Sequence, residues 1–346
     1  MKQFLYFIWT IGSLHSNAQT SSWETFELQK LKNRFSSSLI VGLGEVGHGF
    51  ESINEAKSSL VDLLQSEMNF EAIAFESSFT ESVVSFIRDS TLESRTKNFL
   101  YPFWNTPSVR KTLKSFFDKE TSLRPLIIGF DIQEDCRFTK LSQLLIEKQL
   151  ILTNRDKLLE SDSLLSYYIG KHFTRKHALS HQEYLLLVEN YEIIVKEIRA
   201  KQQSVLQYKL LERSIENRKW LCKLLTLTTA KERMYFRDSL MADNVRWIHN
   251  ELYPNNKLIL WAANTHISNN VSNKEPQWMA EWLSSQYSDN YFSIAFNKGS
   301  GNKFLILSKT SYSYYESPSG KFNLVIYLDK LKKIKPDEWN TPCEDR

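Results

Sequence analysis

A glycine-rich turn near the start of the chain carries one carboxylate and one imidazole. An apolar run, residues 39–43, ends at Gly44, and Glu45 and His48 follow it three residues apart. A helical pattern begins directly afterwards. A strand, a turn and a helix in this order present side chains at the carboxyl edge of a parallel sheet. A dinucleotide-binding turn would not place these side chains where pyrophosphate lies, so Glu45 and His48 indicate acid–base catalysis or metal ligation.

Three further apolar runs also end on polar side chains. They are residues 72–75, followed by Glu76; residues 126–130, followed by Asp131; and residues 257–262, followed by Asn264 and His266. Because the carboxyl ends of parallel strands meet at one edge of a sheet, we expect all these groups to lie together. Carboxylates and imidazoles at close range shift one another's pKa values, which prepares a general base for use near neutral pH.

His48 is the residue expected to act as the base. It stands at the start of a helix, whose dipole disfavours imidazolium and so favours the neutral, proton-accepting ring. Glu45 or Glu76 would orient this ring and stabilise the cation, and His266 would contact the water or the oxyanion. Structural roles stay open as alternatives: Glu45 could cap the following helix, Asp131 could satisfy backbone amides in its turn, and His266 could be a core residue.

The elements that must position these groups predict an α/β fold with a mixed, mostly parallel central sheet flanked by helices. The α/β core covers about residues 38–135 and 255–330, and its last three apolar runs read as partly antiparallel strands. Between about 138 and 251 the apolar spacing is helical, which predicts a large helical insertion or subdomain.

Composition is that of a globular protein with a substantial core: 42% of the 346 residues are hydrophobic and 24% are charged. The formal net charge is only +4, and no basic run is interleaved with aromatic residues, so no nucleic-acid partner is expected. Cys136, Cys222 and Cys343 are too few for a disulfide framework, although one bridge is possible. A monomer is the default expectation.

The N-terminus has the three parts of a secretory signal peptide. Lys2 supplies a positive start, an apolar stretch runs from Phe4 to Leu14, and Ser16-Asn17-Ala18 supplies a cleavage pattern. We therefore expect residues 1–18 to be removed and residues 19–346 to be exported, periplasmic or secreted; an uncleaved anchor is the alternative. Later apolar stretches are too short to span a bilayer, so no stable membrane insertion is expected.

Four motifs, in order along the chain, resemble those of the erythromycin esterase family of bacterial hydrolases. They are Gly44-Glu45-Val46-Gly47-His48-Gly49 with Glu51; Phe70 to Glu76; Gly129-Phe130-Asp131; and Arg237-Asp238 with Met241, Ala242 and Asn244. The likeness covers about residues 38–330, most of the chain that would remain after cleavage.

This resemblance implies an α/β core, a large helical part and a cleft between them. It implies that a histidine activates the water that attacks a macrolactone ester, with no required metal or other cofactor. By position that histidine is His48, with Glu45 and Glu76 beside it. Lys57 would line the cleft, and Arg237 would face or buttress it. Macrolides, and with them antibiotic resistance, are therefore candidates for the substrate and the role.

One position departs from the family pattern. The fourth strand of the family usually ends in Trp-Ala-His-Asn-x-His, whereas this chain has alanine at the third place, Ala263. The first of two site histidines is thus absent, and with it an imidazole that could orient water or polarise a carbonyl.

Three hypotheses follow. The first is a metal-independent hydrolase of a small-molecule ester or lactone, and water attack is preferred because no Gly-x-Ser-x-Gly motif is present. Its catalytic residues are His48, Glu45, Glu76 and His266, and its substrate-binding residues are Lys57, Asp131, Arg237, Asn264 and Trp104. The second is a metal-dependent hydrolase, because two histidines and a glutamate form a known zinc set. The third is a catalytically impaired binding protein, with Tyr101, Phe103 and Trp104 around an apolar ligand.

Overall fold

The computed structural model describes residues 29, 31–121, 124–134, 139–172, 178–201, 206–269, 278–301, 303–307, 310–316 and 320–334. The expected signal peptide lies outside these residues, as do Cys136 and Cys343. Cys222 is a buried free thiol. No helix in the described ranges is both long and apolar enough to cross a membrane.

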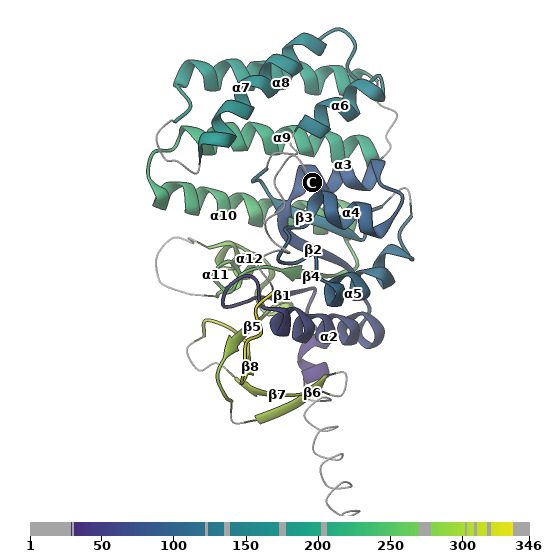
Figure 1. Cartoon of the computed structure of the whole chain (residues 1–346), viewed down its shortest axis with the longest axis vertical. Coiled ribbons are helices and arrows are strands. Elements are labelled where there is room, and N and C mark those ends of the chain that lie inside the picture. The colour runs from purple at the N-terminus through teal and green to yellow at the C-terminus, as the bar shows by residue number, and fades with distance from the viewer. Residues whose placement is uncertain are drawn as a thin grey trace, which may run out of the picture.

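A sheet of eight strands organises the molecule (Figure 1). The strands are β1 (Ile40–Leu43), β2 (Phe70–Ser78), β3 (Ile127–Asp131), β4 (Lys257–Trp261), β5 (Tyr291–Lys298), β6 (Lys303–Leu307), β7 (Thr310–Tyr315) and β8 (Leu324–Leu328). Their order is β3-β2-β4-β1-β5-β8-β7-β6. Neighbours from β3 through β8 are parallel, and β7 is antiparallel to both β8 and β6. The predicted α/β fold with a mixed, mostly parallel sheet is confirmed.

Strand β1 lies in the middle of the parallel strands, between β4 and β5. Val41 is in register with Ile259 on one side and Phe292 on the other. All four residues of β1 are buried. A parallel strand covered on both faces needs a continuous apolar run, and residues 39–43 supply one.

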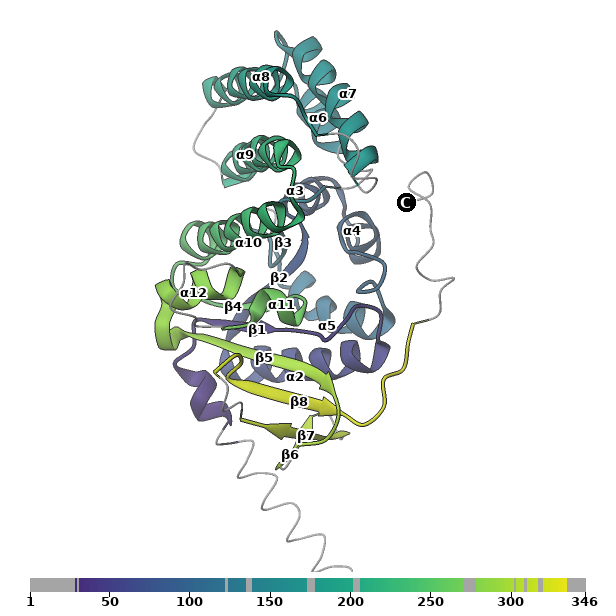
Figure 2. The same cartoon turned by 90° about the vertical axis from the view of Figure 1, so that its left-hand side faces the viewer.

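Helices cover both faces of the parallel strands. On one face α2 (Glu51–Met68) packs against α5 (Pro107–Phe117), and on the other α10 (Ala230–Trp247) packs against α12 (Met279–Tyr287) (Figures 1 and 2). The chain crosses from β1 to β2 and β3 and then returns through β4 to β5. Right-handed crossovers in opposite directions place helices on opposite faces. Shorter helices complete the core: α3 (Phe79–Arg88), α4 (Leu92–Phe99), α11 (Asn264–Ile267) and a 3₁₀ turn (Ser288–Asn290).

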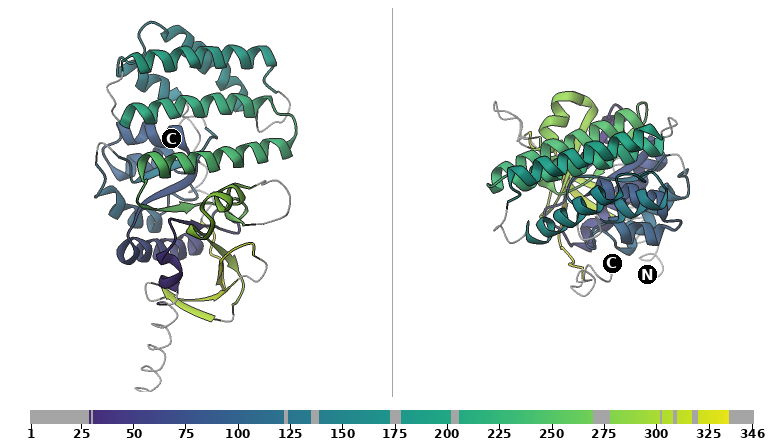
Figure 3. Two further views of the ribbon diagram at one scale, coloured as in Figure 1. Left: turned by 180° about the vertical axis from the view of Figure 1, so that it is seen from behind. Right: turned by 90° about the horizontal axis from the view of Figure 1, so that it is seen from above.

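The chain between β3 and β4 contains helices and no strand in its described residues. They are α6 (Thr139–Glu147), α7 (Arg155–His172), α8 (His181–Ala200), α9 (Leu206–Thr226), α10 and a π-helical turn (Ile248–Leu252). Seen from behind, α8, α9 and α10 lie in successive layers above the sheet (Figure 3). Ser180 and Thr229 begin α8 and α10 with capping boxes, in which each side chain and a glutamate three residues later satisfy backbone amides.

Strand β7 and helix α4 are among the elements that were not expected. Strand β7 has the sequence TSYSYY, and α4 has LESRTKNF, so neither contains an apolar run or stripe long enough to indicate its structure. Pairing with β6 and β8 defines β7, and the Thr91 side chain caps α4 by accepting from the Ser94 amide. In β7, tertiary context decides what local propensity leaves open.

Candidate active site

The polar groups at the ends of β1, β2, β3 and β4 lie along one rim of the sheet. These four strands are adjacent and parallel, so their carboxyl ends point the same way. Across the rim, Asp131 ends β3 and Glu76 lies near the end of β2. Next come the residues that follow β4, among them His266, and then the turn after β1 with Glu45 and His48.

Glu45 holds His48 by one nitrogen of its ring. The distance from His48 Nδ1 to Glu45 Oε1 is 2.6 Å. The ring stacks on Phe103 with centroids 4.5 Å apart, and 37% of the His48 side chain is exposed. Helix α2 begins at Glu51 with Phe50 as its N-cap and no side-chain cap, so Glu45 does not cap it. His48 can therefore carry Nδ1–H toward Glu45 and offer Nε2 as a proton acceptor at an exposed position.

Glu45 is itself held by two buried donors. Trp104 Nε1 donates to Oε1 over 2.9 Å, and Lys57 Nζ donates to Oε2 over 3.1 Å. Lys57 also donates to the carbonyl of Ala262 and lies over the ring of Trp261. Burial lowers the pKa of Lys57 to about 8, against the opposing effect of Glu45. Because Lys57 and Trp104 are both fully buried, they position the carboxylate and do not form a surface for substrate.

Glu76 accepts from three donors that come from distant parts of the chain. Arg237 Nη2 lies 2.9 Å and His266 Nε2 3.1 Å from Oε1, and the amide of Ala263 donates to Oε2 over 2.9 Å. Burial raises the pKa of Glu76, but the positive charges of His266 and Arg237 and the hydrogen bonds outweigh it. The net result is a pKa far below the usual range. Glu76 is thus an ionised acceptor, fixed on both oxygens.

His266 lies between two carboxylates. Its Nε2 faces Glu76, and its Nδ1 is 2.7 Å from Asp238 Oδ1. Burial opposes the charge, yet the two carboxylates raise the pKa of His266 to about 10. The expectation that His266 contacts water or an oxyanion is therefore wrong for this arrangement, because both nitrogens already serve carboxylates. Asp238 was missed as a site residue, although it stands in the Arg237-Asp238 motif.

Arg237 joins Glu76 to Asp131 at the end of β3. Its Nε donates to both oxygens of Asp131 at 3.0 and 3.1 Å, and Nη2 donates to Asp131 as well as to Glu76. Asp131 is completely buried, so it anchors the guanidinium and does not meet solvent. The Arg237 side chain is 16% exposed, and its Nη1 has no hydrogen-bond partner among the described residues. This amino group is therefore available to a ligand.

The backbone of Asn264 joins the loop after β4 to the turn after β1, the next strand in the sheet. Its amide donates to the carbonyl of Glu45 over 2.9 Å, and its side-chain amide donates to Asn297 Oδ1 over 2.9 Å. Asn264 Oδ1 is buried and has no hydrogen bond in the described structure. It lies where a side chain at Gly44 would be, so the turn after β1 and the residues after β4 approach too closely for any Cβ.

Gly44→Ala is therefore expected to lower the free energy of unfolding by about 1–3 kcal/mol. The added Cβ would lie 2.3 Å from Asn264 Oδ1 and 2.7 Å from Ile267 Cδ1. Gly47→Ala is the matched control, because the nearest atom to its Cβ would be 3.7 Å away. Thermal or denaturant unfolding of both variants measures the difference. Equal stabilities would show that the two loops do not meet as described.

Metal ligation was the second hypothesis for His48, His266 and Glu76. In the residues that the structure describes, no three histidine, cysteine, aspartate or glutamate side chains gather as a metal-binding group. The two imidazoles serve different carboxylates, since His48 is bonded to Glu45.

The other histidines in the described ranges differ from one another. His181 is exposed, as expected for a helical surface. His249 lies on the helical insertion but is buried, with Nδ1 3.3 Å from the hydroxyl of Tyr287. The side chains of His172 and His177 lie outside the described set.

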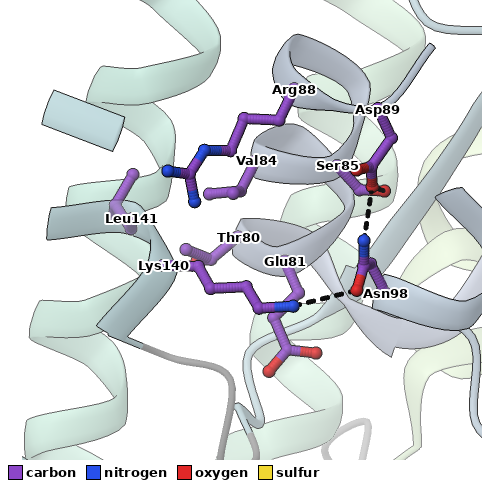
Figure 4. Close-up of a pocket in the computed structure, with 9 residues that line it drawn as sticks. All are labelled: Thr80, Glu81, Val84, Ser85, Arg88, Asp89, Asn98, Lys140 and Leu141. Atoms are coloured by element: carbon purple, nitrogen blue, oxygen red, sulfur yellow. Dashed lines mark hydrogen bonds between the residues drawn. The ribbon is translucent and has the colours of Figure 1, made fainter. Parts of the chain in front are cut away.

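A separate cavity of about 210 Å³ lies between α3, α4 and α6 (Figure 4). In it the Asn98 side chain links Asp89 to Lys140. None of the residues expected to act at the rim lines this cavity.

The fold and the rim define a class: an α/β protein with a helical insertion and two carboxylate-held histidines at the carboxyl edge of its sheet. Residues 164–310 match the family model named Erythromycin esterase. "Putative hydrolase YbfO" of Bacillus subtilis (strain 168) is 25% identical over 276 residues, 73% of this chain and 61% of that protein. The match thus spans less than two thirds of the relative's length. The predicted resemblance to the erythromycin esterase family is confirmed.

Solved structures share the fold. A succinoglycan biosynthesis protein is similar with a TM-score of 0.67 and 16% identity, over 88% of this chain and 91% of that one. A Bacillus cereus protein is similar with a TM-score of 0.62 and 18% identity, over 88% of this chain and 92% of that one. A mutant of the erythromycin esterase EreC in its open conformation is similar with a TM-score of 0.51 and 18% identity, over 89% of this chain and 79% of that one. At these identities the likeness concerns the fold alone.

Proposed function

We propose that this protein hydrolyses an ester or lactone of a small molecule with water activated by His48. The observation that carries the proposal is the Glu45–His48 pair: one ring nitrogen is held at 2.6 Å by a buried carboxylate, and the side chain is 37% exposed. The relationship to the erythromycin esterase family and to a relative named as a hydrolase supports the reaction class. Export through the predicted signal peptide is part of the same proposal.

In the proposed reaction, His48 Nε2 takes a proton from water as the water oxygen attacks the ester carbonyl carbon. Glu45 accepts from Nδ1–H and stabilises the imidazolium that forms. The carbonyl oxygen becomes an oxyanion, and Arg237 Nη1 donates to it. When the tetrahedral intermediate collapses, the carbon–oxygen bond to the leaving alcohol breaks. The alkoxide takes the proton back from His48, and a carboxylic acid and an alcohol are released.

Arg237 replaces His266 in the role of oxyanion donor, because His266 has no nitrogen to spare. Five charged groups surround this part of the site: Arg237 and His266 are positive, and Glu76, Asp131 and Asp238 are negative. The cluster therefore carries one net negative charge, which disfavours a substrate that is already anionic. A neutral carbonyl that becomes negative only in the transition state fits it better.

Arg237→Lys is expected to lower kcat for a neutral ester by on the order of 10²-fold with little change in KM. A lysine ammonium can pair with Asp131 but cannot also present a second amino group in the guanidinium plane. Arg246→Lys is the control, since Arg246 forms a surface ion pair with Asp243 on the same helix. Steady-state kinetics separates the two constants. A rise in KM with unchanged kcat would instead assign Arg237 to ground-state binding.

The first test is hydrolysis of a panel of simple esters, lactones and macrolides by the purified protein, with and without a chelator. Turnover that survives the chelator supports the proposal. Turnover that the chelator removes would assign a metal-dependent reaction. Binding without turnover across the panel would favour an impaired homologue. Ala263 is the feature that favours that outcome, because it leaves an alanine at the rim directly beside Glu76.

A further inference from the structure

His266 is held by a carboxylate at each of its two ring nitrogens. The groups that face it come from two neighbouring elements: Glu76 from β2, and Asp238 from α10 with Arg237 beside it. Ionised carboxylates only accept hydrogen bonds. With Nε2 at 3.1 Å from Glu76 and Nδ1 at 2.7 Å from Asp238, both ring nitrogens must carry a hydrogen to satisfy this geometry.

Asp238 is a buried carboxylate that needs a positively charged partner to offset the cost of its burial. It is completely buried, its Oδ1 accepts from His266 and from the amide of Met279 at 2.9 Å, and its Oδ2 has no hydrogen bond in the described structure. A buried charge with one bare oxygen is costly unless a cation compensates it. His266 is the cation bonded to it, and the Met279 amide ties the carboxylate to the start of α12.

We propose that Asp238 is a positioning residue of the active site, which keeps His266 as an imidazolium and thereby fixes Glu76 and Arg237 in place. This inference rests on the proposed function for its catalytic consequence. Asp238 does not reach the substrate; it acts through His266, Glu76 and then the guanidinium that faces the oxyanion. The structure thus assigns proton transfer to His48 alone, while His266 stays charged throughout. The pKa of His266, raised to about 10, agrees with this assignment.

The test is a pH titration of the histidine rings by NMR, with His266→Gln used to assign the His266 signals. In the wild type we expect His266 to keep both ring N–H groups through about pH 8, because a carboxylate accepts from each of its two ring nitrogens. In Asp238→Asn the pKa of His266 should fall by about 1–3 units, because a neutral amide replaces an adjacent charge. Asp238→Glu keeps the negative charge, so the pKa of His266 in this variant should stay close to its wild-type value.

Asp243→Asn is the matched control. Asp243 lies on the same helix and is paired with Arg213 and Arg246, so its loss removes the same charge without touching His266. The pKa of His266 should not move. In ester kinetics, Asp238→Asn should add a loss of kcat/KM as the pH rises through the lowered pKa of His266, and Asp243→Asn should not.

A wild-type His266 that is neutral near pH 7, or a pKa that Asp238→Asn leaves unchanged, would overturn the inference. If Asp238→Asn fails to fold, the titration of His266 in the wild type and in Asp238→Glu still tests the inference. A wild type that hydrolyses no ester would contradict the proposed function. The ring titration tests the protonation of His266 independently of that result.

Discussion

Replacing His48 with glutamine is expected to lower kcat/KM for ester hydrolysis by on the order of 10²–10⁴-fold. Glutamine can still donate to Glu45, but it cannot take a proton from water. The loss should fall mainly on kcat, because the base acts in the transition state and its ring adds little to ground-state binding. Steady-state kinetics on the best substrate of the ester panel measures it.

His181→Gln is the control for this experiment. His181 is exposed on α8, away from the rim, so its replacement should leave the kinetics unchanged. The pH dependence gives a second criterion. In the wild type, activity should fall in acid, because a protonated base cannot accept a proton from water, and His48→Gln should lose that dependence. A variant that keeps more than about a tenth of wild-type activity would show that another group is the base.

Replacing Arg218 with methionine is expected to lower the free energy of unfolding by about 3–5 kcal/mol. Arg218 lies on α9 and is fully buried. It pairs with Asp162 of α7 at 2.7 Å and with Glu134, after β3, at 3.4 Å, and it donates to Ser142 of α6. Its loss would leave two buried carboxylates without their cation at the junction of the helical insertion and the core.

The pH dependence of this loss has a definite sign. Burial already raises the pKa values of Glu134 and Asp162, and removing Arg218 raises them further. A carboxyl group whose pKa is higher in the folded state destabilises the fold as the pH rises above its unfolded value. The difference between Arg218→Met and the wild type should therefore be smaller at about pH 5 than at about pH 8. Denaturant unfolding at both pH values measures it.

Arg199→Met is the matched control, because Arg199 forms an exposed ion pair with Glu212 between α8 and α9. Its cost should be below about 1 kcal/mol. Adding Glu134→Gln and Asp162→Asn to Arg218→Met should recover part of the stability, since the uncompensated charges are then gone. A cost equal to that of Arg199→Met would show that the three buried groups do not interact as described.

The local pattern of residues was enough to identify which groups end the strands. A continuous apolar run predicts a strand buried on both faces, and the polar residue after such a run lies at or near the carboxyl end of that strand, as Glu76 does in β2 and Asp131 in β3. Glu45, Glu76, Asp131 and His266 could therefore be grouped from the amino-acid sequence by itself. The type of a strand and the position of its ends depend on a few consecutive residues, and so they can be predicted from the sequence.

The partners of these groups were decided by the tertiary structure. Glu76 meets Arg237 across 161 positions of the chain because α10 packs against β3, the neighbour of β2 in the sheet. Trp104, expected to touch substrate, instead donates to Glu45 from the buried side. His266 differs from His48 because two carboxylates face it, one of them Asp238, which no spacing rule connects to it.

Burial and the order of the strands determine which partners these side chains have. The order β3-β2-β4-β1 places Glu76 between Arg237, with its Asp131 anchor, and the loop that carries Ala263, and it leaves His48 at the open end of the rim. An imidazole in an exposed turn can gain and lose a proton, whereas an imidazole between two buried carboxylates keeps it. The residue types alone made both histidines candidate catalysts, and only their packing separates the proposed base from the fixed cation.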